Sequence, residues 1–411
     1  MDRLPDELLL FIFQNVDKST LIYVLFDVCQ RFLRLAVDQS LWKSQASKDH
    51  VAVLDAFHVV TQCHLHGVIP PNMHIVMEGK VDARNHLLQR VLPYAQTLWD
   101  ESEHPCHWTH YAHQLPSTLV EYGTKLKTLE PGTVPRLPCT PQVESLSLFL
   151  EKGSEEAARQ VTYYILNWAQ TCPKLKHLTV DISDDGDNYT TQATDRYRMI
   201  LNYRPSKELW GTWKNLKNIE SLNIPWGLVT FNYLPHHVGI HLRELSISNG
   251  HSFWSDVHDW ERLVKACPNV VNFTGNVRHM HIISLIFTHW RLERCALAEE
   301  DNIRATTDTF PPIPPSMRYL ILPLMDRYYP EWKTILSHDN LRTFSYRKTE
   351  PFDEGEGMEW DNDLEAYMVR HPDLNLVVSR HAWVFISPMD VTDPDYNWNL
   401  PPEDDSNNES Q

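Results

Sequence analysis

The chain has 411 residues, of which 42% are hydrophobic, and a formal net charge of −17 at pH 7, which argues against nucleic acid or an anionic membrane as its main partner. No apolar run approaches the roughly 20 residues that cross a bilayer, and the amino terminus lacks the basic and apolar regions of a secretory signal. The seven cysteines are scattered and odd in number, so we expect a reducing compartment, the cytoplasm and/or the nucleus, and no disulfide framework.

Residues 4–42 predict three short amphipathic helices. Pro5 favours a helix start, because the N–H that proline lacks has no partner there. Residues 17–20 break the pattern with capping residue types. Apolar side chains recur at helical spacing on both sides: Leu8, Leu9, Ile12, Phe13 and Val16 before the break, and Leu21, Val24, Leu25, Val28, Cys29 and Phe32 after it. Three short helices cannot bury so many apolar side chains, which implies a partner.

This spacing resembles the F-box. The matching positions are Leu4, Pro5, Glu7, Leu8, Ile12, Phe13, Val28, Cys29, Arg31, Phe32, Leu35, Leu41 and Trp42. The resemblance implies an F-box over residues 1–45, which docks on a small Skp-type adaptor that bridges to a cullin–RING ubiquitin ligase. The chain would then be a non-catalytic substrate-recognition subunit of an SCF-type (Skp–cullin–F-box) ligase. The alternative is an ordinary helical hairpin packed on its own domain.

The same resemblance implies the residues that bind the adaptor: Leu4, Pro5, Leu8, Leu9, Ile12, Phe13, Val28 and Phe32. Residues 46–115 have apolar side chains at helical steps in His50–Leu65 and Asp82–Leu98, and we expect a helical linker there.

Beyond the linker the chain repeats itself. The segment Thr171–Thr179 resembles Ala266–Thr274 in its Cys-Pro step and in its apolar positions, and each follows an amphipathic helical stretch. A template of apolar-x-x-apolar-x-apolar recurs at Val143–Leu148, Leu175–Val180, Ile219–Ile224, Leu242–Ile247, Val270–Gly275, Leu292–Leu297, Met317–Leu322 and Leu341–Tyr346, with glycine in the last slot of the fifth copy. Their starts are separated by 32, 44, 23, 28, 22, 25 and 24 residues.

Most of these spacings lie near the 20–29 residues of leucine-rich repeats, whose strand has the same Leu-x-x-Leu-x-Leu pattern. The chain therefore resembles an α/β fold, a three-helix F-box followed by a leucine-rich-repeat-like solenoid over residues 116–388 with a strand and a helix in each repeat. A generic α+β domain with leucine-rich strands is the alternative.

In such an array, side chains alternate between the core and an outer sheet face. Leu178, Leu222, Leu245 and Leu320 are expected to point inward, and their polar, aromatic and arginine neighbours outward. Residue types of this kind suit protein recognition. The outward residues expected to bind a protein substrate are His177, Asn223, Glu244, Arg294 and Tyr319.

Three polar segments stand apart from the template. Residues 184–205 predict an exposed loop, and residues 350–363 gather seven carboxylates with no basic residue among them. Residues 389–411 are acidic and free of Lys and Arg, which predicts a disordered tail. The acidic segment could steer a basic ligand, although a solvated loop is the simpler interpretation.

Two other functions stay open. The first is a scaffold protein that binds the adaptor but is not assembled with a cullin. The second is a metal-dependent enzyme built on the His104–His113 cluster, with Cys63, His64 and His66 upstream, because imidazole and thiolate bind zinc. We expect no metal and no active site, since the chain has no Cys-x-x-Cys or His-Glu-x-x-His pattern, no Gly-x-Ser-x-Gly elbow and no glycine-rich phosphate loop.

Overall fold

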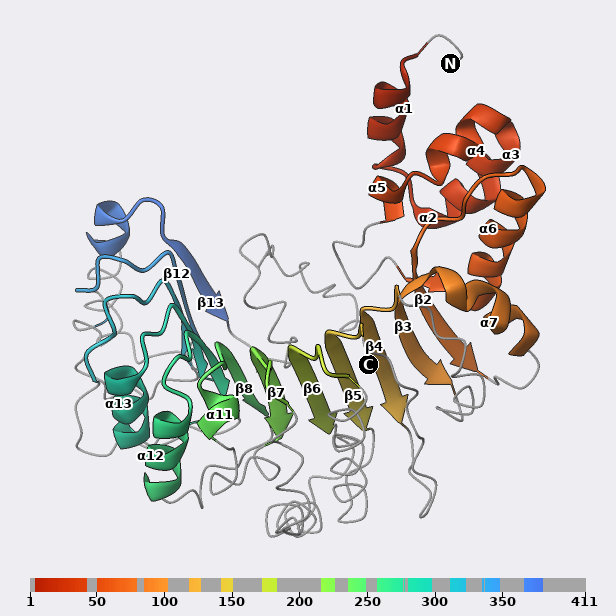
Figure 1. Ribbon diagram of the computed structural model, residues 1–411. Helices are drawn as coiled ribbons and strands as arrows, with labels where there is room; N and C mark the ends of the chain where they lie inside the picture. Colours follow the sequence, from red (N-terminus) through yellow and green to blue (C-terminus); the bar gives the residue numbers. More distant parts are fainter. Residues whose placement is uncertain are drawn as a thin grey trace, which may run out of the picture. The chain divides into compact units, whose positions relative to one another are not determined.

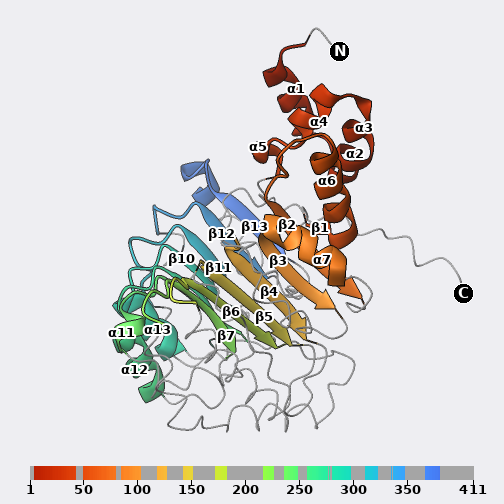
Figure 2. The same ribbon diagram turned by 45° about the vertical axis from the view of Figure 1, so that its right-hand side comes forward.

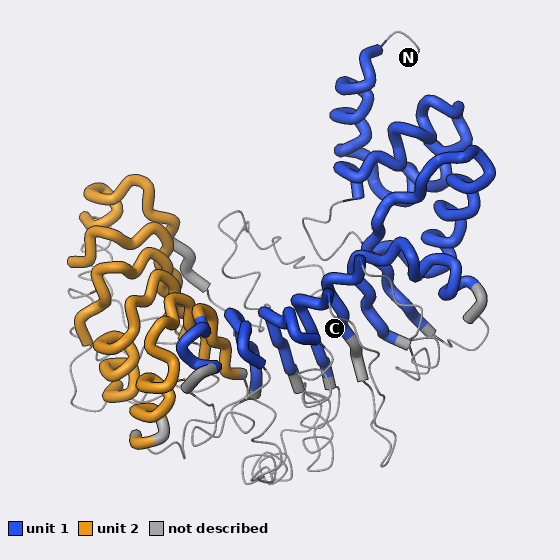
Figure 3. The backbone as a smooth tube through the Cα atoms, in the orientation of Figure 1, with its two compact units in different colours: residues 1–242 blue, residues 243–411 orange. Residues whose placement is uncertain are grey.

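The computed structural model of the protein (Figures 1 and 2) combines amino-terminal helices with a parallel β-sheet. It describes residues 4–42, 50–79, 85–102, 118–126, 142–150, 172–182, 216–225, 236–248, 257–275, 277, 280–297, 311–322, 335, 337–347 and 366–379. The chain divides into two compact units, residues 1–242 (unit 1) and residues 243–411 (unit 2), coloured separately in Figure 3.

The first helices of unit 1 lie where the sequence predicts them. They are α1 (Asp6–Phe13), α2 (Lys18–Thr20), the π-helix η1 (Leu21–Leu25), α3 (Phe26–Val28), α4 (Gln30–Ala36) and α5 (Gln39–Trp42). Pro5 occupies the N-cap position of α1 with an extended backbone. Asp17 caps α2, because its carboxylate accepts a hydrogen bond of 2.8 Å from the backbone N–H of Thr20.

The apolar stripe predicted from Leu21 to Phe32 is wrong as a single helix. The helical path from α2 to α3 stops at Cys29, whose backbone is extended, and the Cys29 Sγ accepts a hydrogen bond of 3.5 Å from the N–H of Phe32. A new helix, α4, therefore begins at this N-cap. Val28, just before the break, is exposed, and Phe32, in the helix after it, is buried.

The helices enclose a core of their own. Phe13 and Phe32 meet edge to face with ring centroids 5.4 Å apart, and the Trp42 indole N–H donates to the carbonyl of Ala36 at 2.8 Å. The buried side chains are Leu9, Phe13, Leu21, Ile22, Phe26, Phe32, Leu33, Ala36, Val37, Leu41 and Trp42.

The rest of unit 1 is built from parallel strands. They are β1 (Val51–Ala52), β2 (Met73–Gly79), β3 (Ala95–Ser102), β4 (Glu121–Leu126), β5 (Ser145–Leu150), β6 (His177–Ile182) and β7 (Ser221–Pro225). Each strand pairs with the next in chain order, and every pairing is parallel. The described helices between or after them are α6 (Val53–Leu65), α7 (Asn85–Val91), the 3-10 helix η4 (Leu92–Tyr94) and α11 (His236–Gly239).

Unit 2 repeats this plan with β8 (Glu244–Ser248), β9 (Asn272–Gly275), β10 (Arg294–Leu297), β11 (Tyr319–Leu322), β12 (Thr343–Arg347) and β13 (Asn375–Ser379), again parallel and paired in chain order. Helices α12 (Val257–Ala266) and α13 (Met280–His289) connect β8 to β9 and β9 to β10. The helix predicted before Cys267 is thus confirmed as α12, with Trp260, Val264 and Cys267 buried.

All eight copies of the strand template coincide with a strand, β5 to β12. Each strand begins two residues after the first apolar position of its copy, as with Leu175 and the start of β6 at His177. The residues predicted to point inward, Leu178, Leu222, Leu245 and Leu320, are all buried.

The template missed β1 to β4 and β13, and the helical linker predicted for residues 46–115 is only partly helical. Helix α6 lies within the predicted stretch, but β2 and β3 continue the parallel sheet through this region. In β3 the slots of the template are occupied by Ala95, Leu98 and Asp100, and in β4 the last slot is Thr124. A template that requires large apolar side chains does not detect a strand that has a small or polar residue at one of these positions.

An aromatic cluster explains the glycine at the last slot of β9. The ring of Phe273 packs between Trp260 and Trp290, with centroid distances of 6.1 and 5.3 Å. A Cβ placed on Gly275 would lie 2.7 Å from Cζ of Phe273. The Phe273 ring therefore fills the space that the last apolar side chain takes in other repeats.

Several predictions fall outside the described residues. These are the helix before Cys172, the 184–205 loop, the His104–His113 cluster, the acidic segment 350–363 and the tail 389–411. Within the described part of the chain, no helix combines the length and the apolar character that a membrane span requires.

Candidate functional site

Two apolar clusters lie exposed on the amino-terminal helices. The α1 cluster consists of Leu8, Phe11 and Ile12, which are 51%, 66% and 44% exposed and lie on one face of α1 at i, i+3 and i+4. The second cluster consists of Val24 in η1 and Val28 in α3, one helical turn apart and about half exposed. Exposed apolar clusters of this kind are candidates for a protein-binding surface.

The structure divides the residues predicted to bind the adaptor into two groups. Pro5, Leu8, Ile12 and Val28 are exposed, and Leu4 is half-buried. Leu9, Phe13 and Phe32, in contrast, are 0%, 3% and 5% exposed and belong to the core of the helices. Phe11 and Val24 are exposed but absent from the predicted set. Phe11 could have been found from its position three residues after Leu8 on the same helical face.

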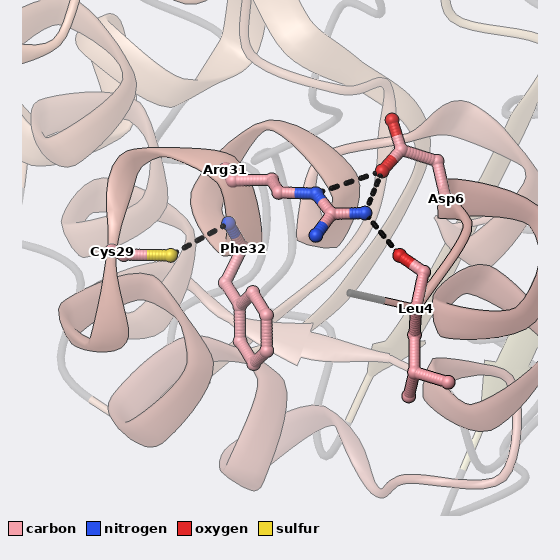
Figure 4. Close-up of polar contacts among 5 residues, drawn as sticks. All are labelled: Leu4, Asp6, Cys29, Arg31 and Phe32. Atoms are coloured by element: carbon pink, nitrogen blue, oxygen red, sulfur yellow. Dashed lines mark hydrogen bonds and ion pairs between the residues drawn. The ribbon is translucent and has the colours of Figure 1, made fainter. Parts of the chain in front are cut away.

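Arg31 fixes the start of α1 against α4 (Figure 4). Its guanidinium donates to Asp6 Oδ1 from Nε at 2.9 Å and from Nη2 at 2.5 Å, and Nη2 also donates to the carbonyl of Leu4. Figure 4 shows Arg31 extending toward the segment that holds Leu4 and Asp6. This contact sets the orientation of the helix that carries the α1 cluster.

Two further contacts fasten the amino-terminal helices to the next elements of unit 1. The Tyr23 hydroxyl donates to Asp55 of α6, and its ring stacks on His58 with centroids 5.5 Å apart. This hydrogen bond is the main cause of the raised pKa of Tyr23. Gln39 of α5 exchanges two hydrogen bonds with the backbone of Asn72, donating at 3.1 Å and accepting at 2.8 Å. The Tyr23 contact with α6 and the Gln39 contact with Asn72 are together called the clamp.

The predicted substrate residues of unit 1 occupy two rows of the outer sheet face. His177 is exposed and stands in register with Ser145 and Ser221. Asn223 is half-buried and lies one row further along the strands, opposite Thr179. The two are therefore near each other on the sheet but not in one row.

In unit 2, three predicted substrate residues share one row. Glu244 pairs with Asn272, Asn272 with Arg294, and Arg294 with Tyr319. The side chains also touch, because Asn272 Nδ2 donates to Glu244 Oε1 at 3.0 Å and the Arg294 guanidinium lies 4.8 Å from the centre of the Tyr319 ring. The structure thus brings Glu244, Arg294 and Tyr319 together.

Three residues of the proposed metal group are described, and they do not converge. Cys63 is buried in α6, where burial raises the pKa of its thiol to about 11. His64 Nε2 lies 3.1 Å from the hydroxyl of Tyr94. Among the described residues, no three His, Cys, Asp or Glu side chains are grouped so that they could hold a metal ion.

Residues 1–47 match a protein family described as F-box-like. The match covers the six amino-terminal helices with both exposed clusters and the Arg31–Asp6 contact, and it confirms the F-box predicted from the sequence. F-box domains bind Skp-type adaptors. No curated protein matches the chain.

Proposed function

We propose that the protein is the substrate-recognition subunit of an SCF-type ubiquitin ligase, acting in the cytoplasm and/or the nucleus. The F-box-like helices dock a Skp-type adaptor, and the sheet-bearing part of the chain binds a protein substrate. The observation that carries the proposal is the α1 cluster, three large apolar side chains exposed on the first helix of an F-box-like segment.

The exposed side chains are the ones assigned to the adaptor. Pro5, Leu8, Phe11, Ile12, Val24 and Val28 are open to a partner in the free chain. Leu9, Phe13 and Phe32 act indirectly, by packing the helices into the shape that presents this surface. A partner that covers the two clusters removes apolar area from water, which is the main favourable term in association.

The remainder of the chain is assigned to a leucine-rich-repeat-like solenoid. Strands in chain order with parallel pairing support this assignment, as do the helices α12 and α13 between successive strands and the shared template of β5 to β12. In such an array each repeat packs on its neighbours, and the outer face of the strands is free for binding. The outward residues His177, Asn223, Glu244, Arg294 and Tyr319 remain the substrate-binding candidates on these strands.

The chain itself performs no chemistry under this proposal. A receptor that holds its substrate beside a charged ubiquitin carrier raises the effective concentration of the reacting groups, and another subunit catalyses the transfer.

The proposal is tested by co-purification of the adaptor and the cullin with the intact, tagged chain from cells. Leu8→Ala/Ile12→Ala should lower adaptor affinity by about tenfold to a hundredfold, because each side chain has about half of its surface left to bury and a full burial is worth about 1.5–3 kcal/mol. The matched control is Leu54→Ala/Leu65→Ala, which removes two exposed leucines of α6.

Loss of adaptor and cullin in the first variant, with both retained in the control, is the expected result. Undiminished adaptor binding in the first variant contradicts the assigned surface. Adaptor without cullin in the wild-type chain contradicts the ligase role and favours the adaptor-bound scaffold.

A further inference from the structure

Four aromatic side chains gather on the outer face of unit 1. Trp99 of β3 lies at a centroid distance of 5.6 Å from Phe149 of β5 and 5.9 Å from His50, which precedes β1. His50 in turn lies 6.4 Å from His74 of β2. All four residues are half-buried.

Glycine at position 123 makes room for this cluster. Gly123 of β4 stands opposite Trp99 in the parallel register, and a Cβ there would lie 2.7 Å from the indole ring atoms Cδ2 and Cε3. The indole therefore lies flat across β4 toward Phe149. Any larger residue at this position would displace the ring.

A carboxylate lies beside the same indole. Glu121 is two residues before Gly123, so it points to the same face of the sheet, and Trp99 hydrogen-bonds its side chain. Burial is the main cause of the raised pKa of Glu121. Within the described part of the chain, no Lys or Arg forms an ion pair with this carboxylate.

The residues beside the site include two carboxylates and one basic residue, since Lys125 of β4 stands opposite Phe149 in register. Glu78 of β2 and Glu101 of β3 stand opposite each other in register, and both are exposed. Each lies two residues further along its strand than the row that contains Trp99. The whole chain adds a net charge of −17. A positively charged ligand would be attracted over distance and then meet a carboxylate at the sheet surface.

The chemistry of the site favours a cation over an apolar group. An apolar occupant would complete the burial of Glu121 and leave its charge unpaired, which costs free energy. A guanidinium or ammonium group would instead pair with the carboxylate while its flat or methylene part lies on the Trp99 ring. Arginine suits both contacts, because its planar group stacks on aromatic rings and forms two parallel hydrogen bonds with a carboxylate.

We propose that Trp99, Phe149 and Glu121 form a binding site on the outer face of unit 1 for an arginine side chain from a basic segment of a protein partner. Lysine binds the same site less tightly. This inference rests on the proposed function for the statement that the partner is the substrate of the ligase, and the site itself is independent of adaptor binding.

The test measures fluorescence anisotropy of a labelled peptide of about eight residues in which arginine alternates with serine, titrated with the purified full chain. A second peptide carries citrulline in place of each arginine, so that its shape is kept and its charge is lost. The wild-type chain should bind the arginine peptide at least about tenfold more tightly than the citrulline peptide, because charge-assisted hydrogen bonds are the stronger class.

Two variants locate the binding. Glu121→Gln and Trp99→Leu should each weaken binding of the arginine peptide at least about fivefold, since one removes the charge and the other the ring. Glu220→Gln, which removes an exposed carboxylate just before β7, is the matched control and should change the affinity less than about twofold. Urea unfolding of each variant checks that the chain still folds.

Equal binding of the two peptides overturns the proposal. So does an equal effect of Glu121→Gln and Glu220→Gln, because the peptide would then sense only the overall charge. Adaptor co-purification with the same variants separates the two proposals. Peptide binding without adaptor binding would support the arginine site and contradict the ligase role. Adaptor binding without peptide binding would support the ligase role and contradict the arginine site.

Discussion

Arg31 and Asp6 form an ion pair that joins the start of α4 to the first turn of α1, with a shortest N–O distance of 2.5 Å. The guanidinium also holds the backbone carbonyl of Leu4. Both side chains are partly exposed, so water screens the pair and it adds little to stability. Its main effect is on geometry, because it fixes the helix that presents Leu8, Phe11 and Ile12.

Arg31→Ala and Asp6→Ala should each lower adaptor affinity by about twofold to fivefold, which corresponds to a pair worth about 0.4–1 kcal/mol. The double variant should cost no more than the larger single change, because both remove the same contact. Affinities are measured by calorimetry with purified adaptor, and Arg34→Ala, an exposed arginine of α4, serves as control. Strictly additive losses would contradict a shared contact.

Asp17 gives the F-box helices a stability that depends on pH. Hydrogen bonds from the hydroxyl of Ser19 and from the backbone N–H and hydroxyl of Thr20 lower the pKa of Asp17 from 3.8 to about 2. The charged form is therefore favoured in the folded state, and its contribution is complete above about pH 4 and is lost as the pH falls toward 2.

Asp17→Asn keeps a capping side chain but removes this charge. The urea midpoint of the variant should be lower than that of the wild type at pH 7, and the difference should shrink between pH 4 and pH 2. Because Asp17 is exposed, the effect should be modest. A difference that grows on acidification would contradict the sign.

Cys29 should be the fastest-labelled thiol of the described residues. It is exposed, whereas Cys63, Cys172, Cys267 and Cys295 are buried. Burial raises the pKa of Cys63 to about 11 and that of Cys267 to about 12, and it raises the pKa of Cys295 as well, so these thiols hold almost no reactive thiolate at pH 7.

Peptide mapping after brief N-ethylmaleimide treatment checks this order, with the urea-unfolded chain as control. Bound adaptor should slow the labelling of Cys29, because Cys29 follows the exposed Val28 directly. Labelling of Cys29 at the same rate in the free chain and in the adaptor complex would place the second cluster outside the interface.

Gly275→Leu restores the leucine-rich pattern of β9 and should nevertheless destabilise the protein. The new side chain would meet the Phe273 ring, since even a Cβ lies 2.7 Å from it. Overpacking of this kind costs about 1–3 kcal/mol. Phe273→Leu/Gly275→Leu frees the space and should recover part of the loss, as measured by urea unfolding. A single variant as stable as the wild type would contradict the packing of Phe273 and Gly275.

Much of the strand architecture could be predicted, because residues such as Leu178 and Leu245 follow an alternation that large apolar side chains make visible. The template did not detect the first strands of the sheet, and the reason is physical. Asp100 of β3 is fully buried at a slot where the template requires an apolar residue, so the pattern failed although the strand is present.

The candidate surfaces were predicted less completely. Helical spacing identified Leu8 and Ile12 but could not separate them from Leu9 and Phe13. The spacing shows which residues share an apolar face of the helix, but not which part of that face is buried and which is exposed. The break at Cys29 depends on a sulfur that caps α4, a role that cysteine rarely takes. Trp99 and Glu121 come together only through the register of β3 and β4, which sequence spacing does not determine.

If the chain acts as proposed, the clamp has a consequence for the choice of ubiquitination site. Tyr23 holds the F-box helices on α6, and Gln39 holds them on the residue before β2. The F-box helices therefore cannot move away from α6 and β2 unless the hydrogen bonds of both Tyr23 and Gln39 break. Under the proposed function, a substrate bound to the first strands of unit 1 would therefore stand at a fixed position relative to the F-box helices, and the lysine that this position offers would be favoured.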